Sequence, residues 1–158
     1  MGRAELEQAK WENLQWAEAY AAQERELRDL SAAVESELRH KQEQLELARG
    51  AKAACETVRT TQSGLFRDLE DFASKVSGAL NEPSVCQGIV STFQDGEGFA
   101  NGAVSAAGRL VEELEGKCNS LSASATDYAS RAQTAADSAR DCWNNADRLQ
   151  REIDNCPE

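Results

Sequence analysis

Apolar and uncharged residues recur at alternating spacings of three and four throughout the C-terminal half of the chain. The series contains no charged residue and runs unbroken for about seven heptads, beyond the three or four that indicate a coiled coil. It therefore predicts one continuous helix over about residues 102–155. The members of this predicted seam are Val104, Ala107, Val111, Leu114, Cys118, Leu121, Ala125, Tyr128, Ala132, Ala135, Ala139, Cys142, Ala146, Leu149, Ile153 and Cys156.

Small residues dominate the middle of this seam. Small side chains let two helix axes approach closely, but each buries little area, at roughly 25 cal/mol per Å². We therefore expect this helix to need a well-fitted partner helix along most of its length, from its own chain or from another. The seam alanines in question are Ala125, Ala132, Ala135, Ala139 and Ala146.

The N-terminal half supplies a candidate for that partner, because its first 80 residues contain no proline and show apolar residues at helical spacing. The pattern predicts a first helical arm over about residues 4–80. Its seam is less pure, since Lys41, Lys52 and Gln62 fall on or near it, and polar seam residues fix register at a cost in stability. The expected seam is Trp16, Tyr20, Leu27, Leu30, Val34, Leu38, Leu45, Ala48, Cys55, Leu69, Phe72, Val76 and Leu80.

Two segments interrupt the helical pattern. The sequence TTQSG at 60–64 joins poor helix formers to a Ser-Gly pair, so that a break there and a continuous first arm both stay open. Residues 81–101 carry Pro83 and several glycines, which stop helices, and they are predicted to form the turn region. No strand pattern occurs. The sequence thus predicts a single all-α domain over 1–158, a long antiparallel helical hairpin or coiled coil.

These boundaries imply a register. If residue 80 faces residue 104 in an antiparallel hairpin, residue 153 faces about residue 31. The first 30 residues would then overhang the pair, by roughly 45 Å at the helical rise of 1.5 Å per residue. The overhang either folds back after a break or meets another protein chain.

Aromatic residues mark this expected overhang. Trp11, Leu14, Trp16 and Tyr20 cover more than one face of a helix, and a helix that is apolar on several faces is normally buried. Trp and Tyr are also the residue types that dominate binding hot spots. These four residues are therefore our predicted partner-binding residues.

Composition and charge narrow the class of protein. With 28% charged and 6% aromatic residues, the chain has the composition of long helices, and its net charge of −11 without a basic patch argues against nucleic-acid binding. No apolar run approaches the roughly 20 residues that a membrane span needs, so membrane insertion is not expected. The N-terminus lacks the apolar core of a signal peptide. We expect a protein made in the cytoplasm, with any secretion following a leaderless route.

The residues that could carry chemistry form no recognisable set. The five cysteines show no CxxC spacing and lie far from the single histidine, His40, so zinc is not supported. The sequence DGEG at 95–98 lacks the spacing of a calcium loop. One histidine cannot complete a Ser-His-Asp or Cys-His set. We therefore predict that the protein is not an enzyme and holds no metal or cofactor, and that its cysteines are reduced thiols.

Two short motifs accompany the helical layout. Phe93 and Gly96 enclose two residues in the predicted turn, and Trp143 is followed four residues later by Asp147 near the end of the second helix. With its acidic balance and no signal peptide, the layout resembles the WXG-type family of small helical hairpins, and more the longer helical partners of LXG toxins. The family turn carries Trp-x-Gly, and its export signal is an aromatic residue followed four residues later by an acid.

This resemblance implies a non-catalytic adaptor or targeting partner that binds a larger secreted effector, an LXG-type toxin, for bacterial type VII export. Trp143 and Asp147 would then be the export signal, and Phe93 and Gly96 the turn motif. Trp143 has a second interpretation, because packing beside the seam would also explain it. The alternative function is a self-associating coiled-coil scaffold, as a homodimer, or a small acidic inhibitor of another protein.

Overall fold

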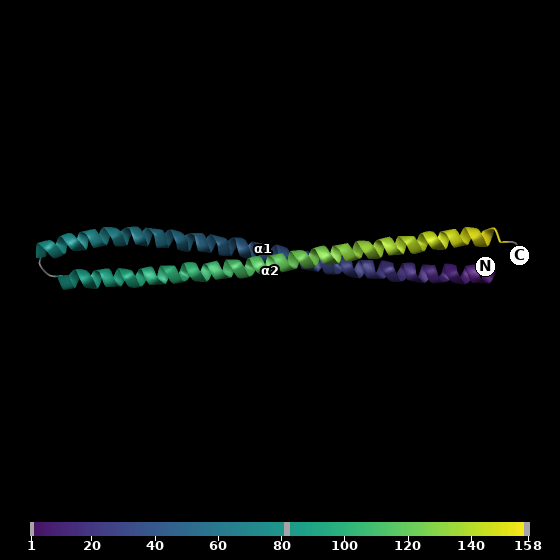
Figure 1. Ribbon diagram of the computed structural model, residues 1–158, viewed down its shortest axis with the longest axis horizontal. Coiled ribbons are helices and arrows are strands. Elements are labelled where there is room, and N and C mark those ends of the chain that lie inside the picture. The colour runs from purple at the N-terminus through teal and green to yellow at the C-terminus, as the bar shows by residue number, and fades with distance from the viewer. Residues whose placement is uncertain (1, 81–82, 157–158) are drawn as a thin grey trace. The chain divides into compact units, whose positions relative to one another are not determined.

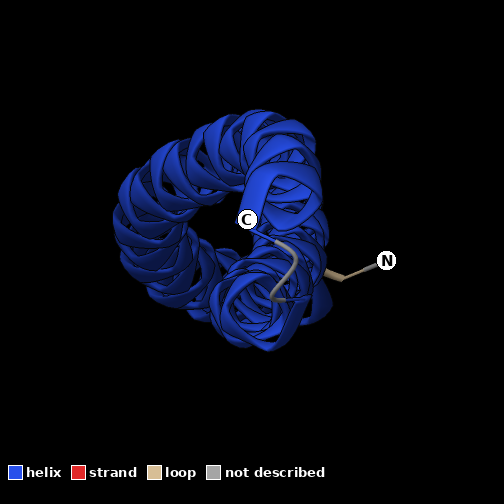
Figure 2. Cartoon of the chain, turned by 90° about the vertical axis from the view of Figure 1, so that its left-hand side faces the viewer, coloured by secondary structure: helices blue, strands red, loops and turns tan. Residues whose placement is uncertain are grey.

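In the residues that it describes, the computed structural model contains two helices, α1 (Arg3–Leu80) and α2 (Pro83–Asp154), which run antiparallel to each other (Figure 1). No strand occurs among the described residues (Figure 2), so the predicted all-α helical hairpin is confirmed. The structure describes residues 2–80 and 83–156, and within them the side chains at all positions other than 73, 74, 76–80, 83–86, 88, 89 and 93.

α1 has no break at 60–64, so the continuous alternative is the correct one. Threonines in and just before this segment form hydrogen bonds from their hydroxyl groups to the backbone of the preceding helical turn. Thr57 and Thr60 donate to the carbonyl oxygens of Ala53 and Glu56, at 3.0 and 2.9 Å. A glycine in a helix costs about 1 kcal/mol relative to alanine. Pairing with α2 along the seam offsets that cost.

The predicted turn region at 81–101 is wrong for most of its length, because α2 begins at Pro83. Proline is well suited to the first helical position, where the missing N–H would have no helical partner. Phe93 and Gly96 consequently lie within α2 and not in a turn. The Phe93 side chain is outside the described ones. Glycines inside this stretch suggested a loop, but each costs only about 1 kcal/mol in a helix.

The chain is organised as two units, each made of one segment of α1 and one segment of α2. The first, here called the terminal unit, comprises residues 1–39 and 119–158. The second, the turn unit, comprises residues 40–118.

The seam predicted for α2 is confirmed, because every one of its positions is buried or half-buried. The alanines are the most enclosed, with Ala132, Ala139 and Ala146 exposing at most 1% of their surface. The three-and-four spacing also continues toward the start of α2, through Ala100, which is buried, and Val90, which is half-buried. The stretch that was expected to form a turn therefore extends the seam.

The two helix axes come close together along this seam. Ser31, which is buried, donates from Oγ to the backbone oxygen of Ala125 across the terminal unit, at 3.3 Å. A short side chain on one helix can reach the backbone of the other only where the facing residues are small. The contact also satisfies a buried hydroxyl group, which would otherwise be costly.

Eight of the thirteen positions predicted for the α1 seam are confirmed, because they are buried or half-buried, but three are wrong. Trp16, Leu30 and Phe72 expose 61, 45 and 64% of their surfaces. The side chains of Val76 and Leu80 are outside those described. The positions that face α2 form a different unbroken series at spacings of three and four, all buried or half-buried: Leu6, Lys10, Asn13, Ala17, Tyr20, Glu24, Leu27, Ser31 and Val34, then Leu38, Lys41, Leu45, Ala48, Lys52, Cys55, Arg59, Gln62, Phe66 and Leu69.

Polar side chains occupy this α1 seam because the facing residues of α2 leave room for their aliphatic parts. In the turn unit, the Lys52 side chain passes beside Gly108, where an added Cβ would lie 4.0 Å from Lys52 Cε. The Gln62 side chain lies across Gly96 in the same way. Long side chains can bury their stems and keep their polar ends in water. Small residues on α2 and long ones on α1 are therefore complementary.

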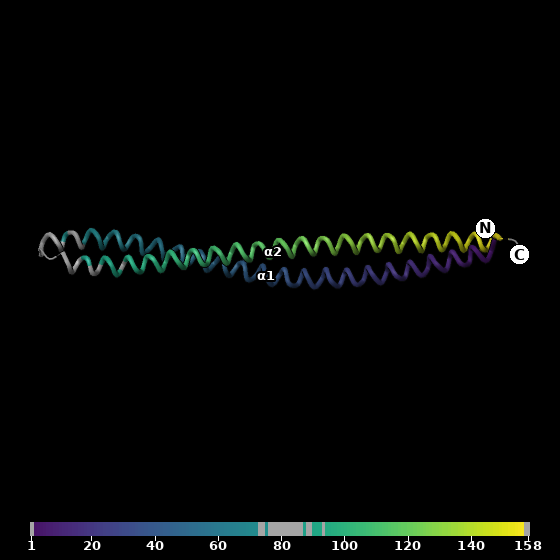
Figure 3. Tube along the Cα trace, turned by 60° about the horizontal axis from the view of Figure 1, so that its bottom comes forward, coloured from purple at the N-terminus to yellow at the C-terminus, as the bar shows by residue number. Residues whose placement is uncertain are grey.

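The expected overhang of the first 30 residues does not exist. Leu6 forms a buried cluster with Leu149 and Ile153, and Lys10 Nζ donates to Gln150 Oε1. The start of α1 and the end of α2 lie side by side in the terminal unit, purple and yellow in Figure 3. The expected register failed because it placed the start of the second helix about twenty residues too late.

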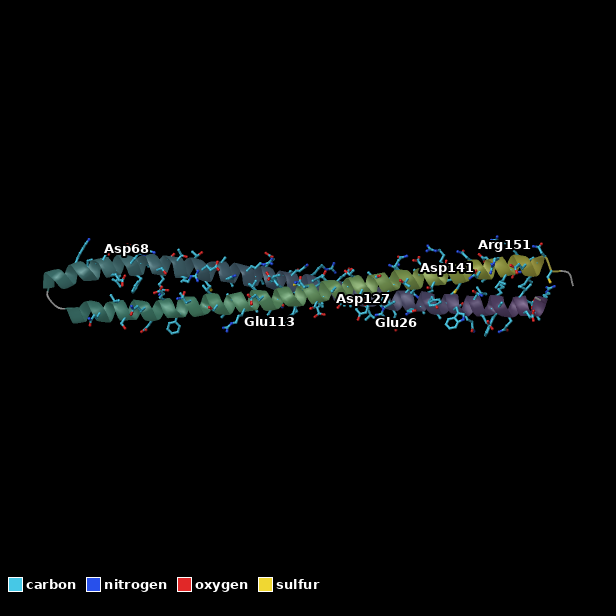
Figure 4. The ribbon with its side chains drawn as sticks, in the orientation of Figure 1. Glu26, Asp68, Glu113, Asp127, Asp141 and Arg151 are labelled. Atoms are coloured by element: carbon cyan, nitrogen blue, oxygen red, sulfur yellow. The ribbon has the colours of Figure 1, made fainter. Side chains whose placement is uncertain are left out.

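Ion pairs add little to this packing but agree with its register. Arg49 bridges the helices of the turn unit, with Nη2 at 3.0 Å from Glu115 Oε1 and Nη1 at 2.7 Å from Glu46 Oε1. These bonds, first that to Glu115, raise the pKa of Arg49. On α2, the hydrogen bond from Lys117 lowers the pKa of Glu113. Exposed pairs of this kind contribute little stability. Most acids, such as Asp141, point outward (Figure 4).

Replacing Ala135 by leucine tests the close seam. Ala135 exposes 5% of its surface, so three added carbon atoms overpack the terminal unit, and we expect the free energy of unfolding to fall by about 1–3 kcal/mol. Urea denaturation measures the change. Ala123→Leu is the matched control, because Ala123 is exposed on the same helix. Equal stability of the two variants would contradict the seam.

Replacing Gly64 by alanine tests the continuity of α1. An added Cβ at Gly64 meets no other atom within 4 Å, so the gain in helix propensity is unopposed. We expect a stabilisation of about 0.4–1 kcal/mol in thermal or urea unfolding. Gly2→Ala should bring no such gain, because Gly2 lies just before α1, its carbonyl oxygen accepts the first helical hydrogen bonds, and alanine is disfavoured at this N-cap position. Destabilisation by Gly64→Ala would show that the chain turns or breaks at this point.

Candidate partner-binding surface

Each helix pair has two flanks beside its seam. In heptad notation the seam positions are a and d, positions e and b form one flank, and positions g and c form the other. In the terminal unit, Lys10 and Ile153 are a positions. The e flank of the terminal unit is the surface that both helices form with Glu7, Trp11, Leu14, Ala21, Trp143, Asp147, Gln150 and Asp154.

A groove runs along this flank between the two helices. It has a volume of about 420 Å³, and it is lined by Glu7, Trp11 and Leu14 from α1 and by Gln150, Ile153 and Asp154 from α2. The hydrogen bond from Lys10 to Gln150 crosses it. On the α1 side, the groove therefore combines the apolar Trp11 and Leu14 with the charged Arg3, Glu7 and Lys10, whereas its α2 side is mainly polar.

Trp143 and Asp147 lie on the same flank, one heptad before Gln150 and Asp154. Trp143 leaves 45% of its surface exposed, while its neighbours Cys142 and Ala146 occupy the seam. The indole ring is thus only partly covered by packing. Asp147 is exposed and forms no ion pair within the described part of the chain. Both members of the sequence motif are accessible to another molecule.

The four predicted partner-binding residues do not form one surface. Trp11 and Leu14, which are 54 and 36% exposed, lie together on the e flank. Trp16 lies on the opposite flank and is 61% exposed, and Tyr20 is half-buried at a seam position. The rings of Trp16 and Tyr20 lie 6.2 Å apart between centroids and are tilted by 32°. The four predicted residues therefore divide into two pairs: Trp11 and Leu14 lie at the groove, and Trp16 and Tyr20 lie together elsewhere.

Sequence reasoning missed that Trp143 shares a flank with Trp11 and Leu14. The signal was present in the positions 6, 10, 13, 17 and 20, whose spacing of four and three sets the face of α1. Two of these positions are Lys10 and Asn13, and the search for apolar residues passed over them. Once this face is set, Leu14 takes position e, as Trp143 does on α2.

Charges near the groove are mixed. Arg3 Nε lies 3.2 Å from Glu7 Oε1, and the ammonium group of Lys10 is held by Gln150. The carboxylate groups of Asp147 and Asp154 add negative charge on the α2 side. A partner with apolar side chains and a basic edge would complement this surface.

The described cysteines are free thiols, and they include Cys118, which is buried in the α2 seam. The side chain of Cys86 is outside those described. No group of three or more His, Cys, Asp or Glu side chains in the described residues could hold a metal ion. No helix in the described part of the chain has a stretch long and apolar enough to cross a membrane.

No family model, curated protein or solved structure matches this chain.

Proposed function

We propose that this protein is a non-catalytic helical adaptor that binds a larger protein through the e flank of its terminal unit. One observation carries the proposal: Trp11, Leu14 and Trp143 are exposed on one flank, beside the exposed carboxylate of Asp147. Tryptophan is the residue type most enriched in binding hot spots. A solvated helix surface has no structural need for two such rings on one flank.

The groove indicates the kind of ligand. A channel between two helices accommodates the apolar face of a third, in the helix-in-groove mode of recognition. Trp11 and Leu14 would contact the apolar positions of that helix, and Asp147 and Asp154 would face basic residues at its edge. The proposed partner segment is therefore an amphipathic helix with lysine or arginine beside its apolar stripe.

The proposal extends to the biological role. The resemblance to helical partners of LXG toxins supports a larger secreted effector as the partner and type VII export as the process. In that role, Trp143 and Asp147 act as the export signal. Their accessibility supports this assignment, since a targeting signal must reach its receptor. Their position beside Trp11 and Leu14 would place the signal next to the bound effector helix.

Replacing Trp11 by alanine tests the binding surface. Loss of a hot-spot tryptophan weakens the free energy of binding by about 2 kcal/mol or more, which corresponds to a roughly 30-fold larger dissociation constant. The measurement is a titration with the partner isolated by affinity capture from the cells that produce the protein. Trp16→Ala is the matched control, because Trp16 is equally exposed but lies on the other flank. Equal losses from the two variants would contradict the assignment of the e flank.

Replacing Asp147 by alanine tests the export role. We expect the amounts of this protein and of its partner in the culture medium to fall at least tenfold, while their intracellular complex persists. Quantitative immunoblotting of medium and cells measures both. Asp141→Ala is the matched control, since Asp141 is an exposed aspartate of α2 at a c position. Unchanged secretion of the Asp147 variant would disprove the export signal and leave the binding proposal standing.

A further inference from the structure

The exposed large apolar side chains of the turn unit are concentrated on a single flank. All six of them in the described residues occupy positions g or c, and Phe99 and Leu47 are the most exposed, at 83 and 77%. We call this surface the g flank of the turn unit. Its large members are Leu47, Val58, Leu65 and Phe72 on α1 and Phe99 and Leu110 on α2.

The opposite flank of the turn unit carries no large apolar side chain. Its e positions carry Gln42, Arg49, Glu56, Ser63 and Glu70 on α1, and Gln87, Gln94, Asn101, Gly108 and Glu115 on α2. The apolar character of the g flank is therefore specific to one side of the helix pair. Monomeric proteins rarely expose contiguous apolar patches larger than a few hundred Å², and larger ones mark interaction sites.

The size of the g flank matches what a stable dimer needs. An aromatic side chain buries roughly 150–250 Å² when it is fully covered, so Phe72 and Phe99 at their observed exposures offer roughly 220–370 Å² per copy. The four exposed aliphatic side chains add to this area, so that the six together approach the roughly 800 Å² per partner of a standard interface.

Large and small residues alternate on this flank. Ala51 and Ala54 separate Leu47 from Val58 on α1, and the same arrangement occurs between Phe99 and Leu110 on α2. One surface thus supplies both the projecting side chains and the hollows that can receive them, as an isologous contact between two copies requires.

The charge pattern also favours a second copy of this chain as the molecule that covers the g flank. The chain carries a net charge of −11, so two copies repel each other over most of their surfaces. No charged residue occupies a g or c position between Leu47 and Leu65 on α1 or between Phe99 and Leu110 on α2. Two acidic chains can meet along this strip without placing acid against acid.

We propose that the g flank of the turn unit binds the same flank of a second copy of this chain. The contact pairs two turn units, so that their four helix segments pack together over an apolar interface. The e flank of the terminal unit takes no part in it. The inference is therefore independent of the adaptor role, and failure of either proposal would leave the other intact.

Analytical ultracentrifugation in reducing buffer, which prevents dimers linked by disulfides, tests the proposal. We expect the full chain to sediment as a dimer that dissociates on dilution. Replacing Leu65 and Phe99 together by lysine should weaken the dimer at least tenfold. The matched control is Gln94→Lys, which adds a lysine on the exposed e flank and should leave the dimer unchanged. Circular dichroism checks that each variant stays helical, and Leu65→Ala with Phe99→Ala replaces the lysine pair if it does not.

A mixing experiment separates lost contact from lost folding. Copies with lysine at positions 65 and 99 and copies with glutamate at both positions should each be monomeric, whereas their mixture should associate. The proposal is overturned if the unaltered chain stays monomeric up to roughly 1 mM, because a dissociation constant above that value corresponds to a binding free energy weaker than about −4 kcal/mol. It is also overturned if the lysine pair dimerises like the unaltered chain, if Gln94→Lys disrupts the dimer equally, or if the mixture stays monomeric.

Discussion

Close approach of the two helices along the alanine-rich seam of α2 is the contact on which the rest of the structure depends. Alanine side chains fill little of the space between helices, so the partner helix must come near or supply long side chains. Both solutions occur in this protein. Ser31 reaches the backbone of Ala125 in the terminal unit, and Lys52 and Gln62 pass beside glycines in the turn unit. The small seam of α2 thus explains how α1 can place polar residues at positions that coiled coils normally reserve for leucine.

The polar residues at the seam positions of α1 also explain why some of its apolar residues are exposed. With lysine, glutamine and glutamate at several seam positions, part of the apolar content of α1 lies on its flanks. Trp11 and Leu14 lie on the e flank of the terminal unit, and Val58 and Leu65 lie on the g flank of the turn unit. A pair of helices built this way gives up some burial within the chain, and it gains surfaces that can be buried against other molecules.

The sequence predicted the fold class and the α2 seam from Val104 onward, because that part of the seam is uninterrupted by charge. It assigned Trp16, Leu30 and Phe72 wrongly to the α1 seam for a physical reason: together with Val58 and Leu65 they repeat at multiples of seven beside the true seam. A stripe at g positions has the same period as one at a positions, and only the facing helix distinguishes them. The turn was misplaced because glycines weaken a helix without ending it when packing compensates.

The candidate surface was predictable in its parts but not in its assembly. Exposed tryptophans near the N-terminus and the Trp143 and Asp147 motif were visible in the sequence. Whether they share a flank depends on register, and register depends on where the second helix begins. An error of about twenty residues there separated Trp11 from Trp143. The packing of Leu6 against Leu149 and Ile153 brings them onto one flank.

The pairing of the start of α1 with the end of α2 has a consequence for the newly made chain. Contacts between residues so distant in sequence form late, because loop closure must come first, whereas the turn unit joins segments that are closer together. During synthesis the first helix segment leaves the ribosome well before the segment that covers it. The e flank of the terminal unit, with Trp11 and Trp143, can therefore form only after Trp143 has been translated. A polypeptide cut short before that point would carry Trp11 but could not display the composite surface.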